Sequence, residues 1–437
     1  MQTSVPDYKY KITTLQLSTI IICFLMNMLD GMDVMVISYS ASSISKEWTI
    51  APAQFGLVFS IGLLGMAMGA MFLAPRADII GRRAMILISA AIMGICVWIT
   101  VLAQSIEQLI FIRFFSGLGI GCLLASTATL TAEYAPVKTK DFWVSFVMSG
   151  YPIGAIFSGL VASEIIPNSG WRMLFQVAGI VTLITLPVIY FFLSESLEFL
   201  LKSQPTNALK RVNAILKKIN LTPLTELPEI EKVLNTKEKA LSDGFLASFV
   251  MRPLSDNPTF YLWSAFFMSF ATLYFLTSWI PKLASASGLS IQLAIFAGTV
   301  FNLGAFFGIV TQGYLSSKFG LKRVIFYFLL STAFFMILFG FFKGSLSILI
   351  LLGLIGFGIQ GGFVGLYSVA ARLYPTKVRS TGVGWSIGVG RIGAIIGPVI
   401  GGILISWGLT MSSNFIIFSV PTIVAGVVTL FISLKES

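Results

Sequence analysis

Long apolar stretches separated by short polar connections follow one another along almost the whole chain. A helix needs about 20 consecutive apolar residues to cross the hydrocarbon core of a bilayer. Twelve stretches reach this length, and a longer polar segment at 195–256 separates them into two sets of six. The pattern therefore predicts an all-α membrane protein with twelve transmembrane helices. The predicted spans are 15–41, 55–75, 84–104, 107–132, 142–166, 172–193, 259–282, 291–316, 324–343, 346–372, 381–407 and 412–434.

The two sets of spans repeat one another at a constant offset of 239 residues. Because each set holds an even number of spans, both sets have the same orientation, and the repeat axis runs along the membrane normal. We therefore predict a six-helix bundle at 1–194, a cytoplasmic linker at 195–256 and a pseudo-symmetric six-helix bundle at 257–437. A solute site is expected at the midplane between the bundles, with access alternating as they rock. The matching positions include Gly81 and Gly320, Gly117 and Gly356, Pro136 and Pro375, and Gly154 and Gly393.

The linker contains an amphipathic segment at 207–219. If this segment is helical, its apolar residues fall on one face, and its lysines and its arginine lie elsewhere. Two interpretations stay open, namely a helix on the cytoplasmic surface of the membrane and a solvated basic linker.

Composition supports the membrane assignment. Hydrophobic residues make up 56% of the chain and charged residues only 11%, whereas soluble domains carry roughly 25% charge. The net charge of +11 would also suit a nucleic-acid-binding protein, but the distribution of the charges argues against it. With the N-terminus inside, 23 of the 29 Lys and Arg residues fall on the inner side and four on the outer side. This split follows the positive-inside rule, so we expect both termini in the cytoplasm and no nucleic-acid partner.

The loop after the second predicted span contains a glycine turn flanked by charges. It reads Ala74-Pro-Arg-Ala-Asp78-Ile-Ile-Gly81-Arg82-Arg83, and a weaker copy lies at 313–323. Such a turn presents cations to helix C-termini and carboxylates, which predicts a conformational role. The loop resembles the Gly-x-x-x-Asp-Arg-x-Gly-Arg-Arg signature of the major facilitator superfamily, although Ala74 replaces the first glycine and Ile79 the first arginine. The residues predicted to control gating are Asp78, Gly81, Arg82, Arg83, Glu133, Lys318, Arg372 and Arg379.

Two further stretches resemble a narrower group within that superfamily. The first span carries Leu-Asp-Gly-Met-Asp at 29–33, and the eleventh carries Gly-Arg-Ile-Gly at 390–393. Both are similar to the aromatic acid:proton symporter family, and the resemblance implies that the acidic pair and Arg391 take part in the transport of anionic substrates. The sequence departs from related carriers at 194–196, where Ser-Glu-Ser replaces a frequent Pro-Glu-Ser. The fifth span also lacks the Gly-Pro-x-x-Gly-Gly pattern of drug/proton antiporters.

Four ionisable side chains lie deep in the predicted spans, namely Asp30, Asp33, Arg113 and Arg391. A charge at mid-bilayer costs at least about 2.5 kcal/mol unless it is paired or lines a cavity. Asp30 and Asp33 lie three residues apart on one helical face, and two carboxylates in a low-dielectric cavity disfavour double ionisation. We interpret this pair as the site of the coupling proton, because the chain has no histidine to carry it. In the alternative, a cation such as Arg113 holds the pair permanently.

Arg391 lies about a third of the way into the eleventh span, opposite Pro152 in the repeat. The matching position in the first half has no charge, so Arg391 does not belong to a salt bridge that both halves share. We therefore interpret Arg391 as the group that binds a substrate carboxylate, to which a planar guanidinium is suited. A helix-packing or gating role is the alternative. The other candidate substrate-binding residues are polar or amphipathic side chains in the spans, which could equally join helices. They are Arg113, Tyr39, Tyr151, Tyr274, Asn302, Gln360, Tyr367 and Trp385.

No phosphate loop or metal-binding cluster accompanies the spans. The Gly-x-Gly-x-Gly at 117–121 lies within a span, where it indicates close helix packing. The three cysteines also fall in spans, so they imply no disulfide framework.

We therefore predict a secondary active transporter and not an enzyme, with protons as the coupling ion and no other cofactor or metal. The favoured function is proton-coupled symport of an aromatic or related organic carboxylate by a monomer in the cytoplasmic (inner) membrane. One alternative is a carrier of another solute, such as nicotinate, a sugar, a siderophore or a drug, acting in either direction. The other is a receptor that binds a solute without translocating it.

Overall fold

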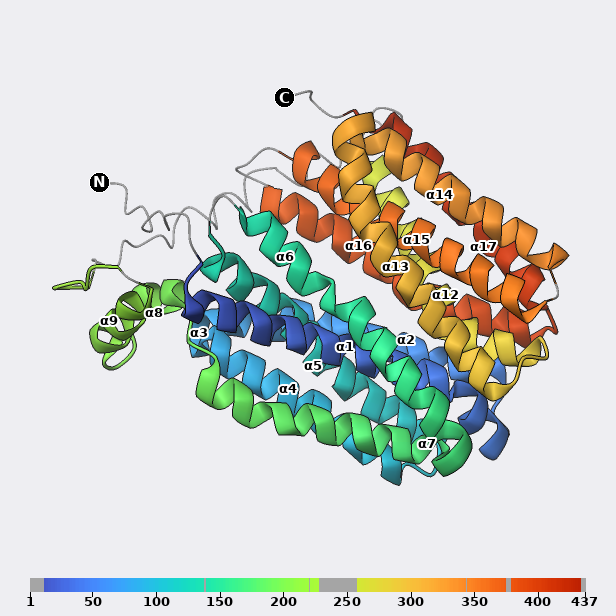
Figure 1. The fold of residues 1–437 in the computed structure, drawn as a ribbon, viewed down its shortest axis with the longest axis horizontal. Helices are drawn as coiled ribbons and strands as arrows, with labels where there is room; N and C mark the ends of the chain where they lie inside the picture. Colours follow the sequence, from blue (N-terminus) through green and yellow to red (C-terminus); the bar gives the residue numbers. More distant parts are fainter. Residues whose placement is uncertain are drawn as a thin grey trace. The chain divides into compact units, whose positions relative to one another are not determined.

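The computed structural model describes residues 12–136, 139–219, 221–227, 258–342, 344–374 and 379–433, without the side chains at 141 and 379–381. These residues form helices and contain no β-strand (Figure 1). The α-helices are α1 (Thr14–Glu47), α2 (Pro52–Met68), α3 (Ala77–Ile80), α4 (Arg82–Ile99), α5 (Ile106–Tyr134), α6 (Lys140–Met148), α7 (Gly150–Phe192), α8 (Leu197–Ser203), α9 (Ala208–Lys218), α12 (Pro258–Ala286), α13 (Ile291–Phe319), α14 (Leu321–Leu338), α15 (Ser345–Leu373), α16 (Arg379–Ser406) and α17 (Met411–Phe431). The short π and 3-10 segments are η1 (Gly69–Leu73), η2 (Ala74–Arg76), η3 (Thr100–Leu102) and η6 (Phe339–Phe341).

Eleven continuous helical stretches in the described residues are long and apolar enough to cross a membrane. One of them, Phe142–Phe192, has 51 residues, which at about 1.5 Å per residue is more than twice the length that a bilayer core requires. Gly170 interrupts this stretch with φ 80° and ψ 170°, a conformation that favours glycine. The chain turns there, so the stretch supplies two spans. The predicted all-α membrane fold of twelve helices is therefore confirmed.

Several helices extend beyond the apolar segments that predicted them. The first span was expected at 15–41, but α1 continues to Glu47 through polar residues. The second was expected at 55–75, and its helical stretch runs over Pro52–Ile80. Hydropathy marks only the part of a helix that matches hydrocarbon, whereas backbone hydrogen bonding continues into the polar ends.

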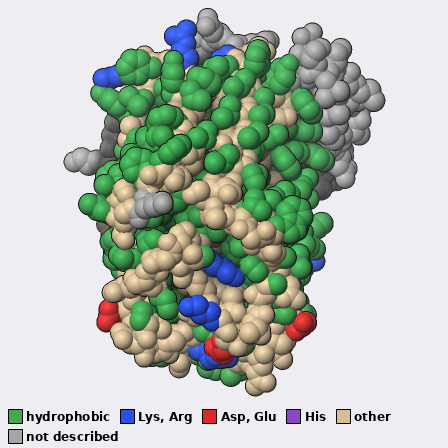
Figure 2. Space-filling view, turned by 90° about the vertical axis from the view of Figure 1, so that its right-hand side faces the viewer, with side chains coloured by type: hydrophobic (Ala, Val, Ile, Leu, Met, Phe, Trp, Pro, Cys, Tyr) green, Lys and Arg blue, Asp and Glu red, His purple; other side chains and the backbone are tan. Residues whose placement is uncertain are grey.

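The described surface carries many large apolar side chains that no protein atom covers. Ile184 is 64% exposed, Phe191 75% and Phe341 79%, and Figure 2 shows one face covered mainly by hydrophobic side chains. Water-soluble monomers rarely expose apolar patches larger than a few hundred Å². The apolar surface therefore fits a lipid environment.

By packing, the chain divides into two compact units, and neither is one continuous segment. Unit 1 comprises 1–34, 64–154 and 172–231, and unit 2 comprises 35–63, 155–171 and 232–437. The end of α1, the start of α2 and the middle of α7 thus pack with the helices of the second repeat. The boundaries predicted from the repeat, at 194 and 257, separate homologous halves of the sequence and not units of packing. They remain a prediction.

Glycines bring the helices of unit 1 into backbone contact. A Cβ on Gly121 of α5 would lie 1.9 Å from the carbonyl oxygen of Met66 in α2. A Cβ on Gly154 of α7 would lie 1.9 Å from the carbonyl oxygen of Met28 in α1. Small residues permit such approach between membrane helices. The predicted packing role of the glycines at 117–121 is therefore confirmed.

In unit 2, α12 packs against α16 and α17, α13 packs against α15, and α14 packs against α15 and α17 (Figure 1). Glycines again set the closest approach, because a Cβ on Gly393 would lie 2.1 Å from the carbonyl oxygen of Phe267. Aromatic rings fill the remaining space, and Phe275 stacks on Phe418 with their centroids 3.8 Å apart. The contact between α12 and α16 places Arg391 beside the aromatic face of α12.

The described part of the linker forms α8 and α9, which pack on each other. The apolar face of α9 is buried, with Val212 at 0% and Leu216 at 4% exposure. The side chain of Asn213 exchanges hydrogen bonds of 2.9 and 2.8 Å with the backbone of Leu224. The apolar face of α9 therefore packs within the protein. Neither of the two interpretations, a helix on the membrane surface or a solvated linker, predicted this packing. The remainder, 228–256, lies outside the described residues.

Replacing Gly393 by Ala is expected to destabilise the protein by about 1–3 kcal/mol, because the added methyl would overpack the contact between α12 and α16. Gly388→Ala is the matched control, since it lies on the same helix and its Cβ would meet nothing within 4 Å. The midpoint of thermal unfolding in detergent micelles measures both changes. Equal midpoints for the two variants would contradict the proposed packing.

Candidate functional site

A buried ion pair joins α1 to α5 in unit 1. The Arg113 guanidinium lies 2.9 Å from Asp33 Oδ1, and the Ser116 hydroxyl donates to Asp33 Oδ2 over 3.0 Å. Asp33 is 1% exposed and Arg113 5%. Such a pair is stable in a low-dielectric interior because further hydrogen bonds satisfy its oxygens. Ser116 was not among the predicted residues, although its place three residues after Arg113 on the same helical face would have indicated it.

Asp30, the second acid of the predicted proton pair, lies one helical turn before Asp33 and is 2% exposed. At the next residue α1 packs closely on α7, because a Cβ on Gly31 would lie 2.0 Å from the carbonyl oxygen of Tyr151. The structure brings both acids into the buried part of unit 1. Asp33 is paired with Arg113, which is what we expected for Asp33 if a cation holds the acidic pair permanently. The role of the two acids in proton coupling stays a prediction.

In unit 2, Arg391 lies in an aromatic cluster formed by α12, α15 and α16. Its guanidinium carbon lies 5.7 Å from the centroid of the Phe270 ring. Phe270 stacks on Tyr274 at 5.9 Å, and Phe363 meets Tyr367 edge to face at 5.4 Å. Phe363 also meets Phe270 edge to face at 4.6 Å, which connects Tyr367 to the ring beside Arg391. Three predicted substrate residues, Arg391, Tyr274 and Tyr367, are thus brought together.

The sequence of the second half holds a feature that we did not predict from it. Between Asp256 and Glu436 it contains no Asp or Glu, but ten Lys and Arg residues. A cation between these two positions therefore has no carboxylate side chain within the same stretch to pair with. Instead, three of these cations lie over aromatic rings, namely Arg391, Lys282 and Lys318. The Lys318 ammonium group lies 4.5 Å from the centroid of the Tyr314 ring.

Other predicted substrate residues use their polar groups within the protein. The Tyr39 hydroxyl donates to the carbonyl oxygen of Ala155 over 3.0 Å, and Asn302 donates to Gly298 in its own helix over 2.9 Å. Gln360 is buried on α15, at 8% exposure. Trp385 is 47% exposed and stacks on Trp263, with centroids 6.2 Å apart. The role of these four residues in substrate binding stays a prediction.

A charged network lies at the loop end of unit 1, around the predicted gating residues. The Arg82 side chain lies 2.7 Å from both Asp78 Oδ1 and Glu133 Oε1. The Asp78 side chain is 72% exposed and that of Glu133 only 11%. Because solvent weakens exposed pairs, Glu133 is the stronger partner of Arg82. The Ser196 hydroxyl donates to the second oxygen of Glu133.

Glu195 organises the same region, and we did not predict it as a site residue. Its carboxylate accepts hydrogen bonds from the backbone N–H groups of Arg83 and Ser196, over 3.1 and 2.9 Å. It thereby binds the first turn of both α4 and α8, where a negative charge is favourable. A Cβ on Gly81, whose φ is 102°, would lie 2.3 Å from its Oε2. The position of this acid just before a helix start, between two serines, is the signal that could have identified it.

The basic residues after the two glycine turns cap equivalent helix ends. Arg83 donates to the carbonyl oxygen of Tyr190 near the end of α7, and Lys322 donates to that of Ile432 beyond α17 over 2.8 Å. Gly320, like Gly81, has a positive φ, of 87°. This is the geometry that the glycine-turn pattern predicts, whereas the gating role stays a prediction. Arg372 is exposed, and the Arg379 side chain lies outside the described residues.

The end of α1 meets α12 within unit 2. Pro281 has no N–H, so the carbonyl oxygen of Thr277 lacks its usual helical donor. The Ser38 hydroxyl approaches this oxygen to 2.9 Å and that of Ser278 to 2.8 Å, and donates to them. A serine on α1 thus satisfies a backbone group that a proline on α12 releases.

Lys282 ties α1, α2 and α12 together one turn further along. Its ammonium group donates to the Ser45 hydroxyl over 2.7 Å. It also lies 5.2 Å from the centroid of Phe55 and 5.4 Å from that of Trp279. Trp279 is fully buried and donates to the carbonyl oxygen of Pro398 in α16 over 2.9 Å. These contacts join α1, α2, α12 and α16 in this part of unit 2.

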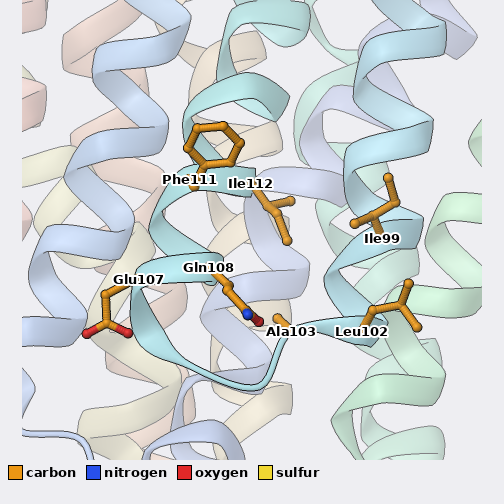
Figure 3. Close-up of a pocket in the computed structure, with 7 residues that line it drawn as sticks. All are labelled: Ile99, Leu102, Ala103, Glu107, Gln108, Phe111 and Ile112. Carbon is orange, nitrogen blue, oxygen red and sulfur yellow. The ribbon is translucent and has the colours of Figure 1, made fainter.

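A shallow depression lies at the turn between α4 and α5, with a volume of about 510 Å³ (Figure 3). Ile99, Leu102, Phe111 and Ile112 give it an apolar lining, and Glu107 points away from the other side chains. It contains no cation that could bind an organic anion. This depression therefore does not resemble the Arg391 cluster as a substrate site.

Replacing Arg113 by Ala is expected to lower stability by about 3–5 kcal/mol, because it leaves the Asp33 charge buried without its cation. The double variant Asp33→Asn/Arg113→Ala should be more stable than Arg113→Ala alone, since it removes that charge as well. Thermal unfolding in detergent micelles measures this coupling, with exposed Lys210→Ala as the control. Additive effects of the two single changes would contradict a coupled pair.

Comparisons with known proteins agree with this architecture. The sequence matches the family described as Major Facilitator Superfamily over residues 23–312 and 262–437. The 4-hydroxybenzoate transporter PcaK of Acinetobacter baylyi is 31% identical over 403 residues, which cover 91% of this chain and 87% of that protein. The benzoate transport protein of the same organism is 30% identical over 422 residues, or 95% and 88% of the two chains.

Among solved structures, the inward open conformation of the xylose transporter XylE from E. coli matches with a TM-score of 0.73. The match covers 96% of this chain and 97% of that one at 16% identity, so it shows the fold alone. The family match and the relatives together identify the chain. It belongs to the Major Facilitator Superfamily and is a multi-pass membrane transporter, not an enzyme.

Proposed function

We propose that this transporter carries a monocyclic aromatic carboxylate together with protons. The observation that carries the proposal is the Arg391 guanidinium in the aromatic cluster of α12, α15 and α16. The relatives support it, because they are transporters of 4-hydroxybenzoate and of benzoate.

The chemistry of the cluster matches the two parts of such a substrate. A guanidinium binds a carboxylate through two parallel hydrogen bonds. Aromatic rings pack against a substrate ring in stacked or edge-to-face geometry, worth about 0.5–1.5 kcal/mol per pair beyond the buried area. A neutral sugar would use neither the charge of Arg391 nor the apolar aromatic lining of the cluster. The cluster therefore favours an aromatic anion over a neutral solute such as a sugar.

The proton site that we propose is the Asp33–Arg113 pair, with Asp30 beside it. Protonation of Asp33 would neutralise one partner, weaken its attraction to Arg113 and release the contact between α1 and α5. Loss of the proton would restore the pair. Because the pair joins two helices, proton binding would thereby be linked to a rearrangement of unit 1.

We further propose that the transporter acts as a monomer in the cytoplasmic (inner) membrane, with both termini in the cytoplasm. The distribution of Lys and Arg supports this orientation. In this orientation the glycine turns face the cytoplasm, and the contacts of Ser38 and Lys282 face the outside. Small organic anions and the lipid bilayer are the expected partners, without nucleic acid or a metal.

Purified transporter in liposomes should accumulate benzoate and 4-hydroxybenzoate when the outside is made acidic, and a protonophore should abolish the accumulation. Asp33→Asn should keep solute exchange but lose gradient-driven accumulation, because the amide cannot release a proton. Glu164→Gln, an exposed acid-to-amide change, is the control. Uptake that is equal with and without the gradient would exclude proton coupling.

Arg391→Ala is expected to raise the KM for benzoate roughly ten- to hundredfold, the factor that corresponds to about 1.5–3 kcal/mol for hydrogen bonds to a charged group. The KM of Arg391→Lys should lie between those of the wild type and Arg391→Ala, since lysine keeps the charge but not the bidentate geometry. Initial uptake rates measure both, with Lys210→Ala as a control for the loss of a positive charge. An unchanged KM for benzoate in Arg391→Ala would contradict the proposed substrate site.

A further inference from the structure

We infer that Phe270 is the positioning residue of the substrate site, and that its ring face orients Arg391 to accept a carboxylate in the guanidinium plane. This inference rests on the proposed function. Arg391 lies 5.7 Å from the ring centroid, within the roughly 6 Å over which a cation is attracted to an aromatic face.

The Phe270 ring is held firmly enough to orient another group. It is 1% exposed. Tyr274 stacks on it with an interplanar angle of 8°, and Phe363 meets it edge to face at 4.6 Å and 83°. A Cβ on Gly390 would lie 2.4 Å from the ring, so the backbone of α16 presses against it as well. Neighbours from three helices therefore define its plane.

A phenyl face stabilises a cation without occupying its hydrogen-bond donors. All five N–H donors of a guanidinium point outward in its plane, and a carboxylate partner would compete for them. The ring of Phe270 has no acceptor oxygen, so it supports the charge and leaves the donors to other groups. The stretch between Asp256 and Glu436, which contains no Asp or Glu, has the composition that this arrangement requires.

The ring also limits the direction from which a substrate carboxylate approaches. Contact between Phe270 and the guanidinium favours ligands that approach along an edge, where two parallel hydrogen bonds form. If the ring were replaced by an aliphatic side chain of similar size, Arg391 would keep its charge but lose its fixed orientation. We therefore expect affinity for carboxylates to fall while the rate of reorientation between states is retained.

The first test compares Phe270→Leu with Phe270→Tyr in liposomes, measuring KM and kcat for benzoate uptake. Phe270→Leu should raise the KM roughly five- to thirtyfold with kcat within twofold of wild type, the range that a desolvated cation–π contact supplies. Phe270→Tyr keeps the ring and should stay within about threefold of wild type. A purely structural role would instead lower kcat, or protein yield, for both variants.

The second test keeps the volume of the side chain and changes only its electrostatics. Fluorinated phenylalanines with increasing numbers of fluorine atoms are placed at 270, because each fluorine weakens the negative ring face. The logarithm of KM should rise steadily along the series. The matched control is the same series at Phe275, which lies on the same helix and stacks on Phe418. That series should be flat.

The outcomes separate this inference from the proposed function. If Arg391→Ala impairs benzoate uptake but the fluorinated series at Phe270 is flat, the positioning role is wrong and the proposed function stands. If Arg391→Ala has no effect, the proposed function fails. If Phe270→Leu does not fold, the fluorinated series decides the question, because it preserves packing.

Discussion

A charged side chain within a membrane helix must find a stabilising partner, because hydrocarbon offers none. The two halves of this transporter meet that constraint differently. In unit 1 the buried cations have carboxylates, as Arg113 has Asp33 and Arg82 has Glu133. In the second half the sequence holds no Asp or Glu between 256 and 436, and aromatic faces receive Arg391 and Lys282 instead. The two halves thus stabilise their cations in different ways, one with carboxylates and the other with aromatic rings.

Glycine sets the closest approach between helices in both units. Helix backbones touch where a glycine has no side chain. Gly154 permits this between α7 and α1, and Gly393 between α16 and α12. Since such contacts are made by the absence of a side chain, they tolerate no added methyl. The packing of both units therefore depends on these glycines.

The sequence alone predicted much of the fold and part of the site. Apolar length located the spans, and the repeat marked Arg391 as an unmatched cation within a span, whose role in binding substrate stays a prediction. Sequence could not decide between the two roles of the acidic pair, because helix rotation determines whether Arg113 faces Asp33. It also did not indicate the contacts of Glu195 and Phe270. Each of these side chains contacts a residue that is more than 100 positions away, and one phenylalanine among 38 carries no local signal.

The hydrogen bond between Ser38 and Thr277 joins two residues exactly one repeat length apart. A residue that touches its own duplicate lies on the axis that relates the two copies. If the chain descends from a six-helix ancestor that paired with itself, these two positions were once the same residue facing its twin across a dimer interface. Proline stands at 281 in the second copy but serine at the matching position 42 in the first. In the present chain one copy supplies the donor and the other the acceptor, so the two matching positions are no longer interchangeable.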